Sequence, residues 1–182
     1  MMLFFVFIIG LFVGSFLGVL TDRLPKERSV IKGRSHCEKC KKELAWYDLI
    51  PLLSFLMLKG KCRYCHTPLS LYYPLIEFVT GIMFVLVYFF VGIMNHELRI
   101  MDLAYYLFVV SGFIVIFFAD LKYGIIPDKI VFSSIIASFI YLFLIHNSLF
   151  LIHLFAALGA SLFFLFLFLV TQGRGMGFGD VK

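Results

Sequence analysis

Residues 107–119, Leu-Phe-Val-Val-Ser-Gly-Phe-Ile-Val-Ile-Phe-Phe-Ala, decide the fold of this chain, and they end at Asp120. With the residues before them they form a predicted span at 102–119. Its length is near the ~20 residues that an α-helix needs to cross the hydrocarbon of a bilayer. An ionised carboxylate near lipid is costly, so we take Asp120, where the membrane should end, as a candidate functional residue.

The rest of the chain has the same character. Of its 182 residues, 62% are hydrophobic and only 15% are charged, whereas soluble domains are on average about half apolar and a quarter charged. Further spans are predicted at residues 2–20, 75–94, 129–146 and 149–171. We therefore expect an all-α membrane protein, a polytopic bundle of about five transmembrane helices.

The positive charge predicts the orientation of these spans. Eleven of the 16 Lys and Arg residues fall within residues 23–63, and loops of this kind stay on the cytoplasmic side. No Lys or Arg precedes the first span and no small-residue cleavage site follows it, so we interpret it as a retained helix. The N-terminus is then outside, and residues 120–128 and 172–182 are cytoplasmic. A basic segment can also bind nucleic acid, but between spans we favour a cytoplasmic loop and expect no nucleic-acid partner.

All four cysteines lie in this loop, in two Cys-x-x-Cys pairs that 21 residues separate: Cys37, Cys40, Cys62 and Cys65. Paired knuckles at this separation are typical of a tetrahedral zinc site. Four thiolates close the coordination sphere, so we favour a structural Zn²⁺ over redox chemistry. His36 and His66 adjoin the outer cysteines and could serve as substitute ligands, but four cysteines suffice. Between the pairs, residues 46–58 are amphipathic or apolar, and we expect them against the membrane face or on the bundle.

Two features of the predicted spans bear on packing. Gly10, Gly14 and Gly18 form one stripe that lets another helix approach closely, and we favour this role over ligand contact. Glu77 follows Pro74 at the start of the second span. It either accepts hydrogen bonds near the N-terminus of a helix or binds a substrate amine, and the sequence favours neither.

A second acid, Asp180, ends the segment Gly-Met-Gly-Phe-Gly-Asp at residues 175–180. The predicted topology places Asp120 and Asp180 on the same side of the membrane. A carboxylate pair of this kind can cleave a peptide bond with water, since one acid is ionised while the other keeps its proton. Spacing alone leaves the structural alternatives open, in which Asp120 ends its helix among headgroups and Asp180 caps a following helix.

Four segments together resemble one known family. They are the first-span residues 14–19 (Gly-Ser-Phe-Leu-Gly-Val) with residues 23–25 (Arg-Leu-Pro), the tetracysteine loop, residues 73–77 (Tyr-Pro-Leu-Ile-Glu), and the two aspartate motifs, Asp120 through residues 126–128 (Ile-Pro-Asp) with residues 177–180 (Gly-Phe-Gly-Asp). In these segments the chain is similar to the type IV prepilin peptidases. These are the bifunctional leader peptidases and N-methyltransferases of pilus, type II secretion and competence systems.

The resemblance implies a multi-pass aspartyl protease of the bacterial cytoplasmic (inner) membrane, of the Gly-x-Gly-Asp type, with Asp120 and Asp180 as its catalytic acids. It would cut the leader from prepilin or pseudopilin substrates at the cytoplasmic face, and then methylate the new N-terminus with S-adenosylmethionine. Residues 1–73 would be the methyltransferase-associated region, with the first span and the tetracysteine loop. Residues 74–182 would be the peptidase region. The residues that bind the methyl donor stay unassigned.

One departure from the family pattern changes the expectation for activity. The chain ends at Lys182, two residues after Asp180, where the resemblance implies further membrane helices. We therefore expect a C-terminally truncated chain with little or no peptidase activity of its own. The alternative function is a zinc-bearing membrane scaffold without catalysis, and a third is a methyltransferase without protease activity.

Overall fold

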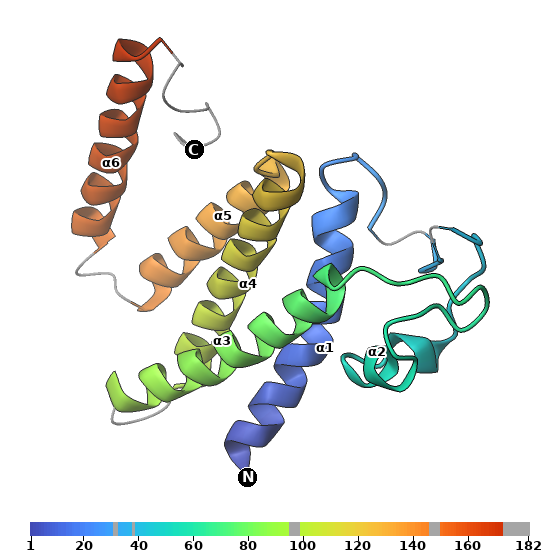
Figure 1. Ribbon diagram of the computed structural model, residues 1–182. Coiled ribbons are helices and arrows are strands. Elements are labelled where there is room, and N and C mark those ends of the chain that lie inside the picture. Colours follow the sequence, from blue (N-terminus) through green and yellow to red (C-terminus); the bar gives the residue numbers. More distant parts are fainter. Residues whose placement is uncertain (31–32, 38, 95–98, 146–149, 173–182) are drawn as a thin grey trace. The chain divides into compact units, whose positions relative to one another are not determined.

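The computed structural model describes residues 1–30, 33–37, 39–94, 99–145 and 150–172, and the regular structure of these residues is helical (Figure 1). In chain order the elements are α1 (Met2–Arg23), the 3₁₀ helix η1 (Trp46–Leu49), α2 (Leu53–Met57), α3 (Tyr72–Met94), α4 (Ile100–Tyr123), α5 (Asp128–Ile145) and α6 (Phe150–Val170). Within these described ranges there are two isolated β-bridges but no strand.

Five of these helices are long and apolar enough to cross a membrane: α1, α3, α4, α5 and α6. A helix suits lipid because all of its backbone hydrogen bonds are made within the segment. The predicted all-α, multi-pass class and the number of spans are therefore confirmed. The protein is a multi-pass membrane protein.

Helix α4 extends further than its predicted span. It continues through Tyr123 and ends at Gly124, which has a left-handed conformation with φ of 63° and donates its N–H to the Asp120 carbonyl at 2.8 Å. Glycine is favoured in this position because a side chain would strain a left-handed C-cap. Asp120 therefore lies in the last turn of α4, within the helix, and not in the loop that follows.

The chain divides into two compact units, residues 1–124 and 125–182. In the first unit, α1 packs against α3, and both contact α4. The largest fully buried side chains in this unit are apolar or small, namely Ile76, Val115, Thr21, Thr80 and Cys62. The two threonines donate their hydroxyls to carbonyls of their own helices, Gly18 and Ile76, at 2.8 and 2.7 Å. The interior of the helix bundle is thus mainly apolar, although Glu77 and Asp102 are also buried, and the hydroxyls of the two threonines are satisfied within their own helices.

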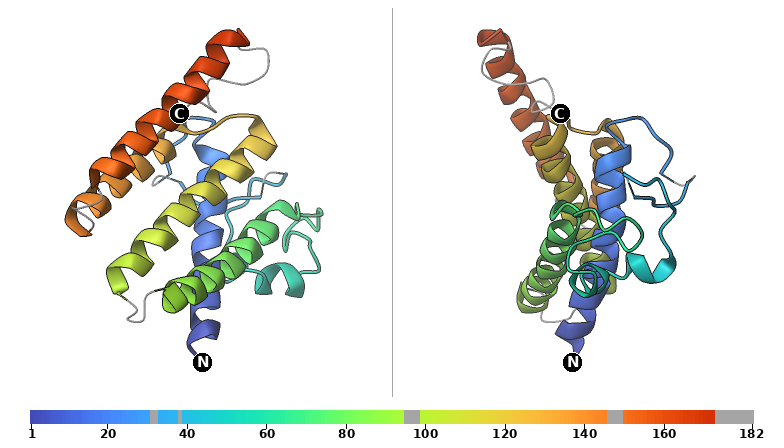
Figure 2. Two further views of the ribbon diagram at one scale, coloured as in Figure 1. Left: turned by 90° about the vertical axis from the view of Figure 1, so that its left-hand side faces the viewer. Right: turned by 45° about the vertical axis from the view of Figure 1, so that its right-hand side comes forward.

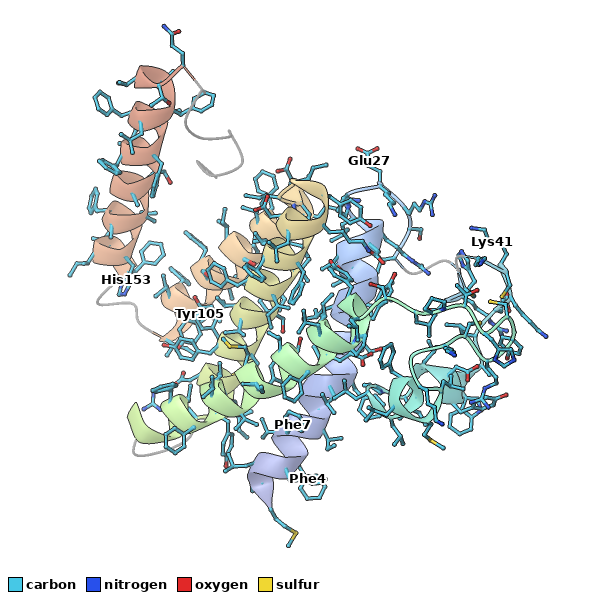
Figure 3. The ribbon with its side chains drawn as sticks, viewed as in Figure 1. Phe4, Phe7, Glu27, Lys41, Tyr105 and His153 are labelled. Atoms are coloured by element: carbon cyan, nitrogen blue, oxygen red, sulfur yellow. The ribbon has the colours of Figure 1, made fainter. Side chains whose placement is uncertain are left out.

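The close contact between α1 and α3 depends on glycine. A Cβ atom on Gly14 would lie 2.7 Å from the Cα of Glu77, and one on Gly10 would lie 2.7 Å from the Cα of Gly81. Figure 3 shows Phe7 on the side of α1 that α3 crosses, where its ring packs on Gly81 and Phe78. The interpretation of the glycine stripe as a helix-packing surface is therefore confirmed.

The second unit contains α5 and α6. The ring of Phe150, at the start of α6, contacts Phe139 and Phe143 of α5, with ring centroids 5.1 and 6.1 Å apart. Most other side chains of both helices are exposed, and they are overwhelmingly apolar. Such surfaces suit lipid, because acyl chains are as apolar as the side chains they meet.

Candidate functional site

The four cysteines of the loop between α1 and α3 come together. All four Sγ atoms lie within 4.8 Å of one another, although the two pairs are far apart in the sequence. The Sγ atoms of Cys37 and Cys65 are 3.8 Å apart. Sulfur ligands at about 2.3 Å from a tetrahedral zinc lie about 3.8 Å from one another. The residues present therefore fit a four-thiolate metal site, as the spacing of the cysteines predicts.

The two Cys-x-x-Cys segments have the same backbone structure. Cys37 donates its N–H to Lys42 and accepts one from Lys41, and Cys62 does the same with Thr67 and His66, all at 2.9–3.0 Å. The residue after each second cysteine has a left-handed backbone, with φ of 58° at Lys41 and 53° at His66. A bridge closes each turn, His36–Glu43 in the first and Lys61–Pro68 in the second. The loop thus presents two equivalent knuckles that face each other.

Hydrogen bonds within the knuckles influence the thiols. The hydroxyl and the backbone N–H of Thr67 lower the pKa of Cys65 to about 6, and its Sγ lies 3.3 Å from the Thr67 hydroxyl. The N–H of Lys42 lowers the pKa of Cys40, but desolvation and the three other thiols raise it to about 11. The pKa values of the thiols in the cluster therefore differ, and Cys65 loses its proton more readily than Cys40. Four thiolates this close together repel one another, so a bound cation would stabilise them, and its binding would release the remaining thiol protons.

A second contact stabilises the loop around the knuckles. The carboxylate of Asp48, in η1, accepts a hydrogen bond from Arg63 Nε at 2.7 Å and one from the Ala45 N–H at 3.3 Å. The Asp48 side chain is almost fully buried, and Arg63 also lies over the Tyr47 ring. Because Arg63 lies between Cys62 and Cys65, this ion pair fixes η1 to the second knuckle.

Asp120 lies on the outer side of α4. Its side chain is exposed, as are those of Phe117 and Phe113, about one and two turns earlier, whereas Phe118 and Ala119 are buried against the other helices. The buried residues fix the rotation of α4 about its axis, so Asp120 faces away from α1 and α3. Asp180 lies outside the described residues, as does the whole glycine-rich segment 175–180.

A polar cluster that the sequence analysis missed holds the helix ends near Asp120. Asp22, in the last turn of α1, accepts hydrogen bonds from Lys122 Nζ at 2.6 Å and from the Tyr123 hydroxyl at 2.9 Å. The Tyr73 hydroxyl, from the start of α3, donates to its other oxygen. We call Asp22, Tyr73, Lys122 and Tyr123 the Asp22 cluster. An acid at the end of an apolar run is the signal that identified Asp120, and the same test finds Asp22.

Glu77 connects the loop to α3. Its carboxylate is buried and accepts the backbone N–H of Leu52 at 2.8 Å. The sequence left two roles open for this residue, a hydrogen-bond acceptor near a helix N-terminus or a binding group for a substrate amine. In the structure Glu77 is an acceptor, but its donor comes from the loop and not from α3 itself.

Comparison with known proteins gives two family matches along the chain. The model of the bacterial peptidase A24 N-terminal domain matches residues 8–91, and that of the type IV leader peptidase family matches residues 107–182. A prepilin leader peptidase/N-methyltransferase of Bacillus subtilis is 35% identical over 187 residues, covering 100% of this chain and 70% of the relative. The chain belongs to the type IV prepilin peptidase family.

Other relatives in this family are more similar over shorter stretches. The prepilin leader peptidase/N-methyltransferase of Myxococcus xanthus is 50% identical over 80 residues, which is 44% of this chain and 24% of the relative. That of Klebsiella pneumoniae is 46% identical over 88 residues, 45% of this chain and 39% of the relative. The chain thus spans well under two thirds of these relatives. No solved structure matches it significantly.

Proposed function

We propose that this chain acts in the bacterial cytoplasmic membrane as a peptidase that removes the leader from prepilin-like proteins at the cytoplasmic face. The single observation that carries the proposal is the Bacillus subtilis relative, a prepilin leader peptidase/N-methyltransferase matched along the whole chain. The exposed carboxylate of Asp120, on a helix end that the Asp22–Lys122 ion pair connects to α1, supports it.

In this proposal Asp120 and Asp180 are the catalytic pair. One carboxylate is ionised and takes a proton from the attacking water, while the other is protonated and polarises the scissile carbonyl. The two acids share a proton and titrate as a unit, because like charges held close together disfavour double ionisation. Glycines around Asp180 would let an extended substrate backbone approach the acid closely.

The tetracysteine loop has a structural role in the proposal. Cys37, Cys40, Cys62 and Cys65 hold a Zn²⁺ ion, which supplies folding free energy to a loop too small for a core of its own. With the first span, residues 1–73 form the region associated with N-methylation of the cleaved product. S-Adenosylmethionine supplies the methyl group, and the N-terminus of the chain lies outside.

The decisive experiment is cleavage of a prepilin by membranes that carry single variants. Asp120→Asn and Asp180→Asn each abolish cleavage, because asparagine can neither ionise nor donate an acidic proton. Asp128→Asn is the matched control, since it makes the same chemical change in the same motif and asparagine suits the start of a helix as well as aspartate does. It leaves cleavage intact.

The same variants separate the alternatives. Cleavage that survives Asp120→Asn rules out the carboxylate assignment. If the wild-type chain binds zinc but neither cleaves a prepilin nor methylates a pre-cleaved one, the protein is a membrane scaffold. Methylation without cleavage in the wild-type chain would identify a methyltransferase that lacks protease activity.

A further inference from the structure

The segment between the two knuckles exposes several large apolar side chains. The loop patch consists of Trp46, Leu49, Leu53, Leu56 and Met57, and the exposed fractions of Trp46, Leu56 and Met57 are 77%, 70% and 75%. They all come from η1, α2 and their immediate ends. Exposed apolar patches of this kind mark a binding surface for another apolar partner.

The loop between α1 and α3 folds back along the side of the membrane-spanning helices. Its contact with α3 is the Leu52 N–H on Glu77, in the second turn of that helix. Glu77 in turn packs against Gly14 of α1, nine residues before Arg23, which is about 14 Å along a helix axis. In Figures 1 and 2, α2 lies beside the length of α1 and not beyond its C-terminal end.

This placement is held by specific contacts. The Glu77 carboxylate is buried where it meets the loop, and Leu52 has an unusual backbone with φ of 55° and ψ of −45°. Leucine rarely adopts that conformation, because its Cβ crowds the carbonyl oxygen. Leu52 adopts this conformation where the chain enters α2. Together with its hydrogen bond to Glu77, it fixes the loop against the helices at the level of Glu77.

Charge indicates what covers the patch. Lys59 and Lys61 follow α2 directly and are exposed, and residues 23–63 carry most of the basic residues of the chain. Basic side chains next to a membrane surface attract anionic lipid headgroups. An apolar face with a tryptophan, flanked by lysines, is the composition of an element that lies in the membrane interface.

We propose that residues 46–58 form an interfacial element, in which the loop patch inserts at the boundary between headgroups and acyl chains while Lys59 and Lys61 contact anionic headgroups. The lipid-facing surface of α1 and α3 then continues into the loop. The knuckles lie on the water side of this element, and Figure 3 places Lys41 of the first knuckle at the outer edge of the loop, away from α1. The proposal does not depend on catalysis.

The chain offers a direct test, because Trp46 is its only tryptophan. The purified wild-type protein is reconstituted into vesicles of phosphatidylcholine and phosphatidylglycerol whose acyl chains carry bromine at a shallow or a deep position. The expected result is a blue-shifted emission of Trp46 relative to the unfolded chain, stronger quenching by shallow than by deep bromine, and little quenching by aqueous acrylamide.

Two results would overturn the proposal. Free quenching by acrylamide without quenching by bromine places Trp46 in water. Protection from both quenchers means that protein, such as a second copy of the chain, covers the patch. As a variant arm, Leu56→Asp with Met57→Asp lowers bromine quenching roughly twofold or more, since charge disfavours insertion. Zinc content checks that this variant keeps its knuckles, and unchanged quenching in a zinc-loaded variant contradicts the assigned patch.

Discussion

Asp22 and Lys122 form an ion pair, with 2.6 Å between Oδ1 and Nζ, that joins the last turn of α1 to the last turn of α4 across 100 residues of sequence. Lys122 also lies 4.2 Å from the centroid of the Tyr72 ring, and the Tyr72 hydroxyl donates to the Phe118 carbonyl at 2.9 Å. Asp120 is two residues from this pair. The position of the candidate catalytic acid is therefore set by residues of three helices.

The first prediction concerns that pair. Asp22→Asn removes the charge that Lys122 contacts and lowers the free energy of unfolding in mixed micelles by about 1–2 kcal/mol, the scale of a charged hydrogen bond with some solvent exposure. Tyr123→Phe is the control, because it removes one neutral donor and leaves the ion pair, and it costs about 0.5–1 kcal/mol. Equal effects of the two changes would contradict a central role for the Asp22 charge.

The second prediction tests the contact between α1 and α3. Gly14→Ala places a methyl group 2.7 Å from the Cα of Glu77 and 3.0 Å from Thr80, so the helices must separate, at about 1–3 kcal/mol of unfolding free energy. Gly159→Ala is the matched control, since nothing lies within 4 Å of its added Cβ. It is neutral or stabilises α6 by up to about 1 kcal/mol. A tolerated Gly14→Ala would show that α1 and α3 are further apart.

The third prediction distinguishes the zinc ligands by two adjacent substitutions. Cys65→Ser lowers zinc affinity strongly, because the hydroxyl of serine does not replace a thiolate. His66→Gly leaves the zinc content at one ion per chain, and it also relieves the left-handed backbone at φ of 53°. Metal analysis of the two purified variants gives the answer, and zinc loss in His66→Gly would make that histidine a ligand.

Removal of the metal gives a fourth prediction. A chelator that strips the zinc should free the knuckles and increase amide hydrogen exchange at residues 39–68, while α1 and α3 keep their protection because their packing does not involve the thiols. Metal loss should also increase as the pH falls, since thiols must lose their protons to bind zinc. Unchanged exchange in the stripped protein would mean that other contacts, such as Asp48–Arg63 and Glu77–Leu52, hold the loop without the metal.

The fifth prediction decides between the two roles of Glu77. Glu77→Gln keeps an oxygen that can accept the Leu52 N–H, so loop position and the KM for a prepilin stay near wild type. Glu77→Ala leaves that donor unpaired and costs about 1–3 kcal/mol, and acrylamide quenching of Trp46 reports the released loop. A tenfold higher KM in Glu77→Gln with an unchanged loop would favour the substrate amine instead.

Several features of the structure could be predicted from the sequence, because they depend on local patterns of residues. Apolar runs predict the spans, since lipid demands helices of a fixed length. The two Cys-x-x-Cys pairs predict a cluster, since their ligand types and spacing suit one ion. Gly10 and Gly14 predict a close helix contact. The sequence does not show which residues they contact, which in the structure are Gly81 for Gly10 and Glu77 for Gly14, both on α3.

The sequence by itself determined the all-α membrane class, the number of spans and the cysteine cluster, because each follows from a pattern of residue types and their spacing along the chain. Only the tertiary structure decided that Asp22 meets Lys122, that Glu77 holds Leu52, and that the loop patch lies beside α1. These contacts join residues that are 25 to 100 positions apart. They form because helix packing brings a few polar groups together where hydrogen bonds satisfy them, and hydropathy and spacing do not encode which groups those are.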